Sequence, residues 1–373
     1  MIRIQEVSTK KELKQFVRFP FSLYKNNPYW VPPIIREELE SFDPDKNPVF
    51  EHAEARFFLA YRDGKIAGRI AAIVNWTEIR EQQVKKMRFG WMDFIDDKEV
   101  SKLLLEKVEK IGREHGLEFL EGPVGFSNLD KVGVLTEGFD QIGTMVTWYN
   151  HPYYQDHFRA LGFVPANKFI ESYFYTRNAD ASRYERMAQV IKSRYDLRPL
   201  SFRKTKEVLP FVDEMFELFN LSYEKLPSFV SVSKKQIAYF KKKYIPFINP
   251  EFIKMVVDKE NRLIAFAITM PSFAKALQKA GGKLFPTGFL HLLLARKKSK
   301  ESIFYLIGIL PSYRKKGVTA IIFDEYHKSF KKYGIEKGVL TPELEENKDI
   351  QLIWSNFDPQ IHKRRTTFRK MIQ

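Results

Sequence analysis

A chain of 373 residues, 44% of them hydrophobic and 29% charged, has the size and composition of about two folded globular domains, and no apolar run approaches the roughly 18 residues of a membrane span. The absence of cysteine excludes disulfides, cysteine-bound metals and thiol catalysis and fits a reducing cytoplasm, and no basic head with an apolar run marks a signal peptide. The net charge of +16 favours an anionic partner: nucleic acid, acidic lipid or a phosphorylated small molecule.

The N-terminal stretch begins with a predicted strand over residues 2–7 and continues into a helix whose apolar side includes Leu13, Phe16 and Val17. Residues 24–34 (YKNNPYWVPPI) are rich in proline, asparagine and aromatic side chains, which excludes a regular helix. Two interpretations stay open for this segment: a packed loop that lines a groove, or an ordinary surface loop with aromatic anchors.

A β-hairpin is predicted at residues 56–75, where Asp63 and Gly64 separate two apolar runs. The same pattern returns at residues 252–270, with its turn at 258–261. Two hairpins of similar character in different halves of the chain indicate an internal duplication.

The first hairpin is followed by a predicted strand over residues 89–94 and a helix that begins near Asp96 and Asp97. This turn contains no glycine and is acidic, and carboxylates repel phosphate and satisfy the free N–H groups of a helix start. We therefore expect no phosphorylated ligand here. The acidic turn is interpreted as a helix cap or as a site for a cationic substrate. Its acids are Asp93, Asp96, Asp97 and Glu99.

A glycine-rich segment over residues 117–145 matches no phosphate-loop spacing, and a segment of this kind is either functional or an ordered insertion. Its candidate substrate contacts are Asn128, Asp130 and Glu137. A helix within 151–163 and a closing strand at 170–175 follow. His151 and His157 lie on different helix faces, so we expect no metal site there. The sequence also shows no recognisable Ser-His-Asp arrangement.

The predicted domains are residues 1–178 and 197–373, joined by a polar, helix-prone linker at 179–196. Residues 197–202 restart the fold as a strand, and a helix follows. Its apolar positions are Phe211, Met215, Phe219 and Leu226.

Two stretches carry many cations and no acid. Residues 271–300 hold seven Lys or Arg and the apolar run FLHLLLA; they predict an amphipathic patch on an anionic membrane, a lid over a fatty acyl chain, or a helical insertion packed between the domains. The tail, 361–373, adds five basic residues. It predicts a solvated edge strand protected by charge, or a surface that steers an acidic substrate.

Residues 302–310 are almost wholly apolar and predict a strand buried on both faces, which Pro311 ends. A basic turn with Gly317 follows, and then apolar residues recur at helical spacing from Val318 to Tyr333. A helix start offers free N–H groups and glycine allows close approach, so the turn predicts either a phosphate site or a plain basic connection.

This strand, turn and helix resemble the acyl-CoA-binding signature of the Gcn5-related N-acetyltransferase (GNAT) superfamily. The pattern Arg/Gln-x-x-Gly-x-Gly/Ala falls on Arg314, Gly317 and Thr319, with Thr where Gly or Ala is usual. Residues 336–347 predict the next strand, and 348–357 a short helix in the place of a later helix of the family. The whole chain resembles a tandem GNAT protein of a bacterial two-domain family.

The resemblance implies an α/β (α+β) fold of two GNAT-like domains, each a twisted, mainly antiparallel sheet flanked by helices. It implies acetyl-CoA or a longer acyl-CoA as donor, and a small-molecule or lipid amine as acceptor. The candidate catalytic residues are Tyr305, Glu343 and Asn347. The implied donor-binding residues are Ile309, Leu310, Arg314, Lys315, Lys316, Gly317, Val318 and Thr319.

The competing interpretation is a non-catalytic protein that holds an acyl lipid or an anionic surface on the same scaffold. We expect no nucleic-acid partner, because the basic residues lack an interleaved aromatic platform.

Overall fold

The computed structural model describes residues 1–226, 229–245 and 248–373. In the N-terminal half the strands are β1 Ile2–Glu6, β2 Ala53–Arg62, β3 Lys65–Asn75, β4 Lys86–Phe94, β5 Phe119–Gly122, β6 Val134–Glu137 and β7 Val164–Tyr175. The helices of this half are α1 Lys10–Leu23, α2 Ile35–Ser41, α3 Trp76–Arg80, α4 Lys98–Glu114 and α5 Tyr154–Ala160.

The C-terminal half repeats this alternation of strands and helices. Its strands are β8 Arg198–Leu200, β9 Ile253–Val257, β10 Leu263–Pro271, β11 Glu301–Ile309, β12 Lys337–Leu340, β13 Glu343–Leu344 and β14 Gln360–Met371. Its helices are α6 Ala181–Tyr195, α7 Thr205–Val208, α8 Val212–Tyr223, α9 Lys234–Lys243, α10 Ala274–Ala280, α11 Gly288–Lys298, α12 Thr319–Tyr333 and α13 Lys348–Trp354.

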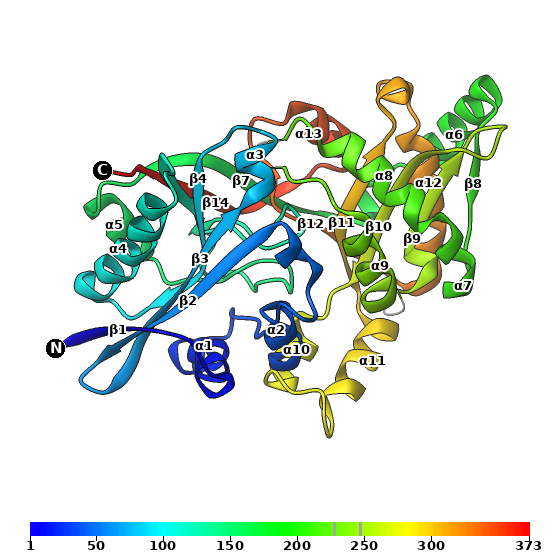
Figure 1. Ribbon diagram of the computed structural model, residues 1–373. Coiled ribbons are helices and arrows are strands. Elements are labelled where there is room, and N and C mark those ends of the chain that lie inside the picture. The colour runs from blue at the N-terminus through cyan, green and yellow to red at the C-terminus, as the bar shows by residue number, and fades with distance from the viewer. Residues whose placement is uncertain (227–228, 246–247) are drawn as a thin grey trace.

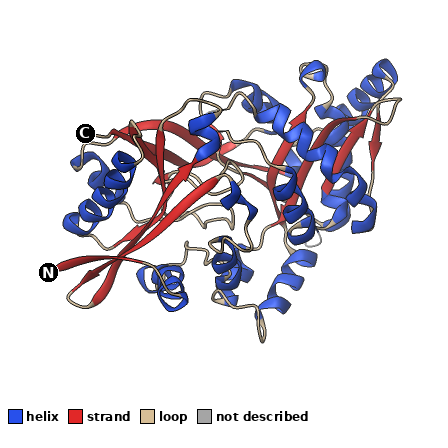
Figure 2. Cartoon of the chain, viewed as in Figure 1, coloured by secondary structure: helices blue, strands red, loops and turns tan. Residues whose placement is uncertain are grey.

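Fourteen strands of the described residues form one mixed, mostly antiparallel sheet that runs through both halves, with helices along its faces (Figures 1 and 2). In each half four antiparallel strands lead into a parallel pair, β4 with β5 and β11 with β12. This repetition confirms the internal duplication. Both predicted hairpins are also confirmed, and Asp63 and Gly64 adopt the positive φ angles, 50° and 79°, that a tight hairpin turn needs.

The last strand of the chain crosses into the N-terminal half. β14 lies between β5 and β7, and β7 in turn lies between β14 and β12. The prediction of a solvated edge strand at the tail is therefore wrong. Its cations tolerate burial because the buried carboxylate of Glu171 on β7 pairs with Lys363, at 3.1 Å, and with Arg365.

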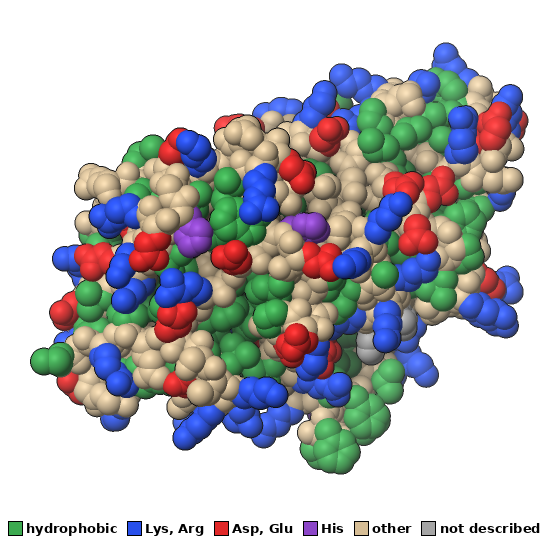
Figure 3. All heavy atoms as spheres, in the orientation of Figure 1, with side chains coloured by type: hydrophobic (Ala, Val, Ile, Leu, Met, Phe, Trp, Pro, Cys, Tyr) green, Lys and Arg blue, Asp and Glu red, His purple; other side chains and the backbone are tan. Residues whose placement is uncertain are grey.

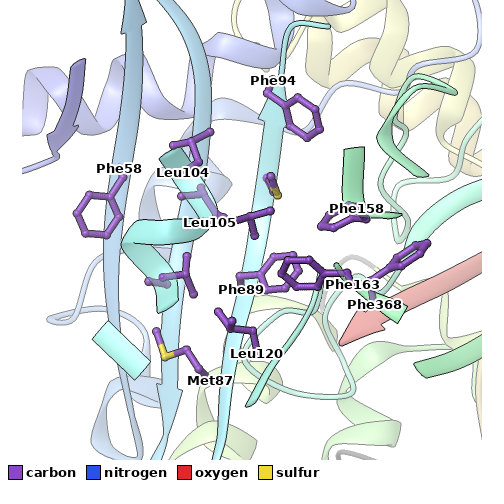
Figure 4. Packing of buried hydrophobic residues seen from close by; sticks show 14 of the residues in the cluster. Phe58, Met87, Phe89, Phe94, Leu104, Leu105, Leu120, Phe158, Phe163 and Phe368 are labelled. Atoms are coloured by element: carbon purple, nitrogen blue, oxygen red, sulfur yellow. The ribbon is translucent and has the colours of Figure 1, made fainter. Parts of the chain in front are cut away.

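β14 also contributes to the N-terminal core (Figure 4). Phe368 stacks on Phe158 of α5 with ring centroids 5.0 Å apart, and Phe158 packs beside Phe89 of β4. The buried side of α4 supplies Leu104 and Leu105 to the same cluster. A second core lies under α6 and α12, so the predicted linker helix is itself packed: Tyr184 and Ala188 are buried there.

Removing the charge of Glu171 is expected to destabilise the junction of the two halves. Despite its burial, Arg365 and Lys363 hold the pKa of Glu171 down at about 2. Glu171→Ala leaves two buried cations without their partner, so we expect the free energy of unfolding to fall by about 3–5 kcal/mol. Urea denaturation measures this, with the exposed Glu346→Ala as the matched control. Equal stability of the two variants would contradict the assignment.

None of the helices in the described ranges is both long and apolar enough to cross a bilayer.

Candidate functional site

The turn between β11 and α12 presents a free helix start. α12 begins at Thr319 without a side-chain cap, and no described residue accepts a hydrogen bond from the backbone N–H of Gly317, Val318 or Thr319. Gly317 has a φ of +75°, in the left-handed region that favours glycine. Four N–H groups at the start of a helix need partners, and here three residues leave theirs for a ligand.

The side chains of this turn are cationic. Arg314 and Lys315 are exposed, and neither forms an ion pair within the described residues. Arg314 Nη2 donates to the carbonyl oxygen of Ser222 at 2.9 Å, while the Lys316 ammonium lies 4.6 Å from the centre of the Tyr313 ring. Together with the positive end of the α12 dipole, these charges make the turn suited to an anion.

Beside the turn, β11 has a free backbone edge. Its pairing with β12 ends at Phe304 and Leu340. Leu310 N donates to Ile264 O, at 2.8 Å on the β10 side, so alternate residues direct their backbone groups the other way. The carbonyls of Ile307 and Ile309 accept from Tyr223 Oη, at 3.1 Å, and from Ser222 Oγ, at 3.3 Å. Ile309 and Leu310 are the two residues predicted to bind a donor through their backbone. The backbone of Ile309 faces the gap between β11 and β12, whereas the N–H of Leu310 already donates to Ile264 O.

Three ionisable side chains with raised pKa values lie near the point where the two strands diverge. Burial raises the pKa of Glu343 to about 7, although Trp354 Nε1 donates to its carboxylate at 2.6 Å. Burial also raises the pKa of Tyr223 to about 12, with a contribution from the Glu343 carboxylate. Tyr305 sits at a bulge in β11, and burial, Asp130 and Tyr223 raise its pKa. Glu343 thus acts on the pKa of Tyr223, and Tyr223 acts with Asp130 on the pKa of Tyr305, so these three side chains and Asp130 form one electrostatically linked group.

The glycine-rich segment of the N-terminal half contacts Tyr305 in this group. Tyr305 Oη donates to Leu129 O at 3.1 Å, and burial raises the pKa of the adjacent Asp130 and lowers that of Lys131. No described residue forms an ion pair with Lys131. Of the other predicted contacts in the segment, Asn128 accepts from the backbone N–H of Val230 at 3.2 Å, and Glu137 pairs with Arg364 at 3.2 Å.

Two of the three catalytic candidates, Tyr305 and Glu343, are linked through Tyr223, but the third is not. Asn347 caps α13, because its Oδ1 accepts from Ile350 N at 3.3 Å. Sequence reasoning missed Tyr223. It stands at the end of α8 with no motif around it, and only the position of that helix over β11 brings it to the site.

In the N-terminal half, the equivalent turn between β4 and α4 has its charged side chains and helix start already paired within the protein. Asp93 pairs with Arg69 at 2.7 Å, Asp97 caps α4 and pairs with Arg62, and Val124 N donates to Phe89 O at 2.8 Å beside β4. The helix-cap interpretation of the acidic turn is therefore confirmed for Asp97.

One Ser-His-Asp contact exists that the sequence did not reveal. His157 Nδ1 lies 2.8 Å from Ser101 Oγ, and its Nε2 lies 2.9 Å from Asp96 Oδ1. Ser101 is fully buried, so it is unsuited to act as a nucleophile, and the contact ties α5 to α4. Within the described residues, no group of three or more His, Cys, Asp or Glu side chains is placed to hold a metal ion.

Solved structures that share this architecture decide the fold. A tandem GNAT protein from the clavulanic acid biosynthesis pathway aligns over 100% of this chain and 99% of its own, with a TM-score of 0.57 and 8% identity. The chain has the tandem GNAT fold. A GCN5-related N-acetyltransferase from Sphaerobacter thermophilus aligns over 100% of this chain and 96% of its own, with a TM-score of 0.52 and 8% identity.

Two curated proteins are similar to this chain in sequence. Protein YghO of Escherichia coli is 24% identical over 371 residues, 97% of this chain and 94% of that protein. The bacterial ceramide synthase of Caulobacter vibrioides is 25% identical over 324 residues, 83% of this chain and 80% of that protein. No protein-family model matches the chain.

Proposed function

We propose that this protein is an N-acyltransferase that moves an acyl group from acyl-CoA to an amine. The observation that carries the proposal is one juxtaposition. The uncapped start of α12 follows directly on the free edge of β11. Tyr223 donates to Ile307 O on that edge, and the nearby Glu343, a carboxyl group with a pKa of about 7, contributes to the raised pKa of Tyr223.

Each part of acyl-CoA has a counterpart in this arrangement, beginning with its phosphates. The free N–H groups from Gly317 to Thr319, with Arg314 and Lys315, are suited to the phosphates of CoA. Thr319 departs from the family pattern only in its side chain, and its backbone N–H stays free for a phosphate. The N–H groups of Ile307 and Ile309 point along the gap and suit the amide carbonyls of the pantetheine arm. The thioester then reaches Glu343.

The reaction needs a base for the ammonium, donors for the thioester oxygen and an acid for the leaving thiolate. Glu343 is the proposed base, because a pKa of about 7 lets it accept a proton at neutral pH. The amine nitrogen bonds to the acyl carbon as the C–S bond breaks, and Tyr223 or Tyr305 supplies a proton to the sulfur. No covalent enzyme intermediate is required, in keeping with a chain that lacks cysteine.

A lipid amine is the acceptor class that we propose. Tyr305 packs on an extensive apolar cluster, and other partly buried apolar side chains pack on the same cluster, among them Leu306, Met145 and Phe273. The relative from Caulobacter vibrioides is named a ceramide synthase, and a ceramide is the fatty amide of a long-chain amino alcohol. Both points support a fatty acyl donor and a long-chain amine over acetyl transfer to a polar amine.

A calorimetric titration with acetyl-CoA, palmitoyl-CoA and CoA tests the proposal. We expect saturable binding of all three and tightest binding of palmitoyl-CoA, because only its chain buries apolar surface in the site. A coupled assay with a long-chain amino alcohol then measures thiol release. If none of the three ligands binds, the non-catalytic interpretation replaces the proposal.

A further inference from the structure

The segment that joins β10 to β11 exposes an apolar face. It folds into the hairpin α10–α11, which projects from the lower edge of the molecule (Figure 1). Phe285, in its loop, is 82% exposed, and four residues of α11 are between 44% and 53% exposed. These four lie one and four positions apart, on one side of the helix. They are Phe289, Leu290, Leu293 and Leu294. Figure 3 shows the hairpin as an apolar protrusion.

The hairpin is fixed to the rest of the protein by its other side. Ala274 and Leu277 of α10 are buried against Val31, and Leu292 of α11 packs on the same cluster. Gln278 Nε2 donates to the carbonyl oxygens of Pro28 and Trp30 at 2.8 and 3.0 Å. The exposed face of α11 is therefore presented in a defined direction, and the loop at 24–34 serves as its anchor.

Charge surrounds the apolar face. Residues 271–300 contain seven Lys or Arg and no acid, and Lys300 pairs with Glu336 at 2.6 Å. The other six form no ion pair within the described part of the chain. Lys297 and Lys298 are exposed and extend the face of α11 by one turn.

We propose that the α10–α11 hairpin docks on an anionic lipid bilayer. Leucine and phenylalanine side chains at the tip insert between lipid headgroups, and the unpaired cations beside them meet acidic phosphates. A second copy of the chain does not fit this surface, because pairing two such faces brings twelve unpaired cations together, six from each copy, without one acid. A bilayer supplies both the apolar interior and the opposite charge. The docking is independent of whether acyl transfer takes place.

Vesicle co-sedimentation of the full chain tests this. We expect binding to vesicles of phosphatidylcholine with phosphatidylglycerol, and weaker binding to phosphatidylcholine alone. The double variants Leu293→Ser/Leu294→Ser and Lys297→Glu/Lys298→Glu are each expected to lower partitioning about tenfold or more. The control Val190→Ser/Leu352→Ser removes two apolar side chains on α6 and α13 that are more exposed still, at 62% and 71%, and should bind like the unaltered chain.

Circular dichroism shows whether each variant is folded. Binding of the unaltered chain that matches that of the Leu293→Ser/Leu294→Ser variant would overturn the proposal. A second outcome would also overturn it: in sedimentation velocity the unaltered chain is a dimer and the Leu293→Ser/Leu294→Ser variant a monomer, and the unaltered chain binds neither kind of vesicle.

Discussion

Glu343→Gln is expected to slow acyl transfer by about 100-fold to 10,000-fold at neutral pH, the usual contribution of a positioned acid or base. Glutamine keeps the shape of the side chain and its hydrogen bond to Trp354, which is 2.6 Å long in the structure, but it accepts no proton from the ammonium. A thiol-release assay with palmitoyl-CoA and a long-chain amino alcohol measures the rate. Palmitoyl-CoA should bind the variant as it binds the unaltered chain.

The pH profile separates a base from a structural carboxylate. Because burial raises the pKa of Glu343 to about 7, the rate for the unaltered chain should rise with pH through that value as the carboxylate loses its proton. Glu346→Gln, three residues along and exposed, should keep the full rate and the same profile. A Glu343→Gln variant that retains the profile of the unaltered chain would exclude this residue as the base.

Much of the fold could be predicted because its signals are local. The Asp63-Gly64 turn between apolar runs indicates a hairpin, since few residues accept positive φ. The continuous apolar run before Pro311 indicates a central strand, and β11 is paired on both sides over residues 302–304. The start of α12 could also be predicted, because glycine and a change of hydrophobic period mark it.

The placement of β14 and the composition of the site are not local properties. From the sequence, Lys363 and Arg365 are expected to be solvent-exposed. Their burial is tolerated because they pair with the carboxylate of Glu171, which lies 192 and 194 residues away in sequence. In the same way, Tyr223 and Asp130 come from elements far in sequence from the turn between β11 and α12. Burial raises the pKa of both groups, and burial depends on tertiary packing, which cannot be predicted from residue spacing along the chain.

Gly317→Asp is expected to weaken acyl-CoA binding by about 100-fold or more. The aspartate carboxylate places a negative charge at the start of α12 and competes for the N–H groups that we assign to the phosphates. A Cβ atom at this position would lie 3.1 Å from Cδ1 of Ile191, the flexible end of a side chain that gives way by a small shift. Isothermal titration calorimetry with palmitoyl-CoA measures the loss.

The matched control is Gly317→Asn, which has the same size as aspartate and, like it, tolerates positive φ. It carries the steric change without the charge, so we expect a smaller loss of about tenfold. Equal losses in the two variants would show that backbone strain dominates, and unchanged binding in both would remove the α12 start from the donor site. Because the turn and the α10–α11 hairpin are separate, both variants should still sediment with anionic vesicles. That combination, donor binding lost and membrane binding kept, is what distinguishes an acyltransferase that works at a lipid surface from a scaffold that only holds lipid.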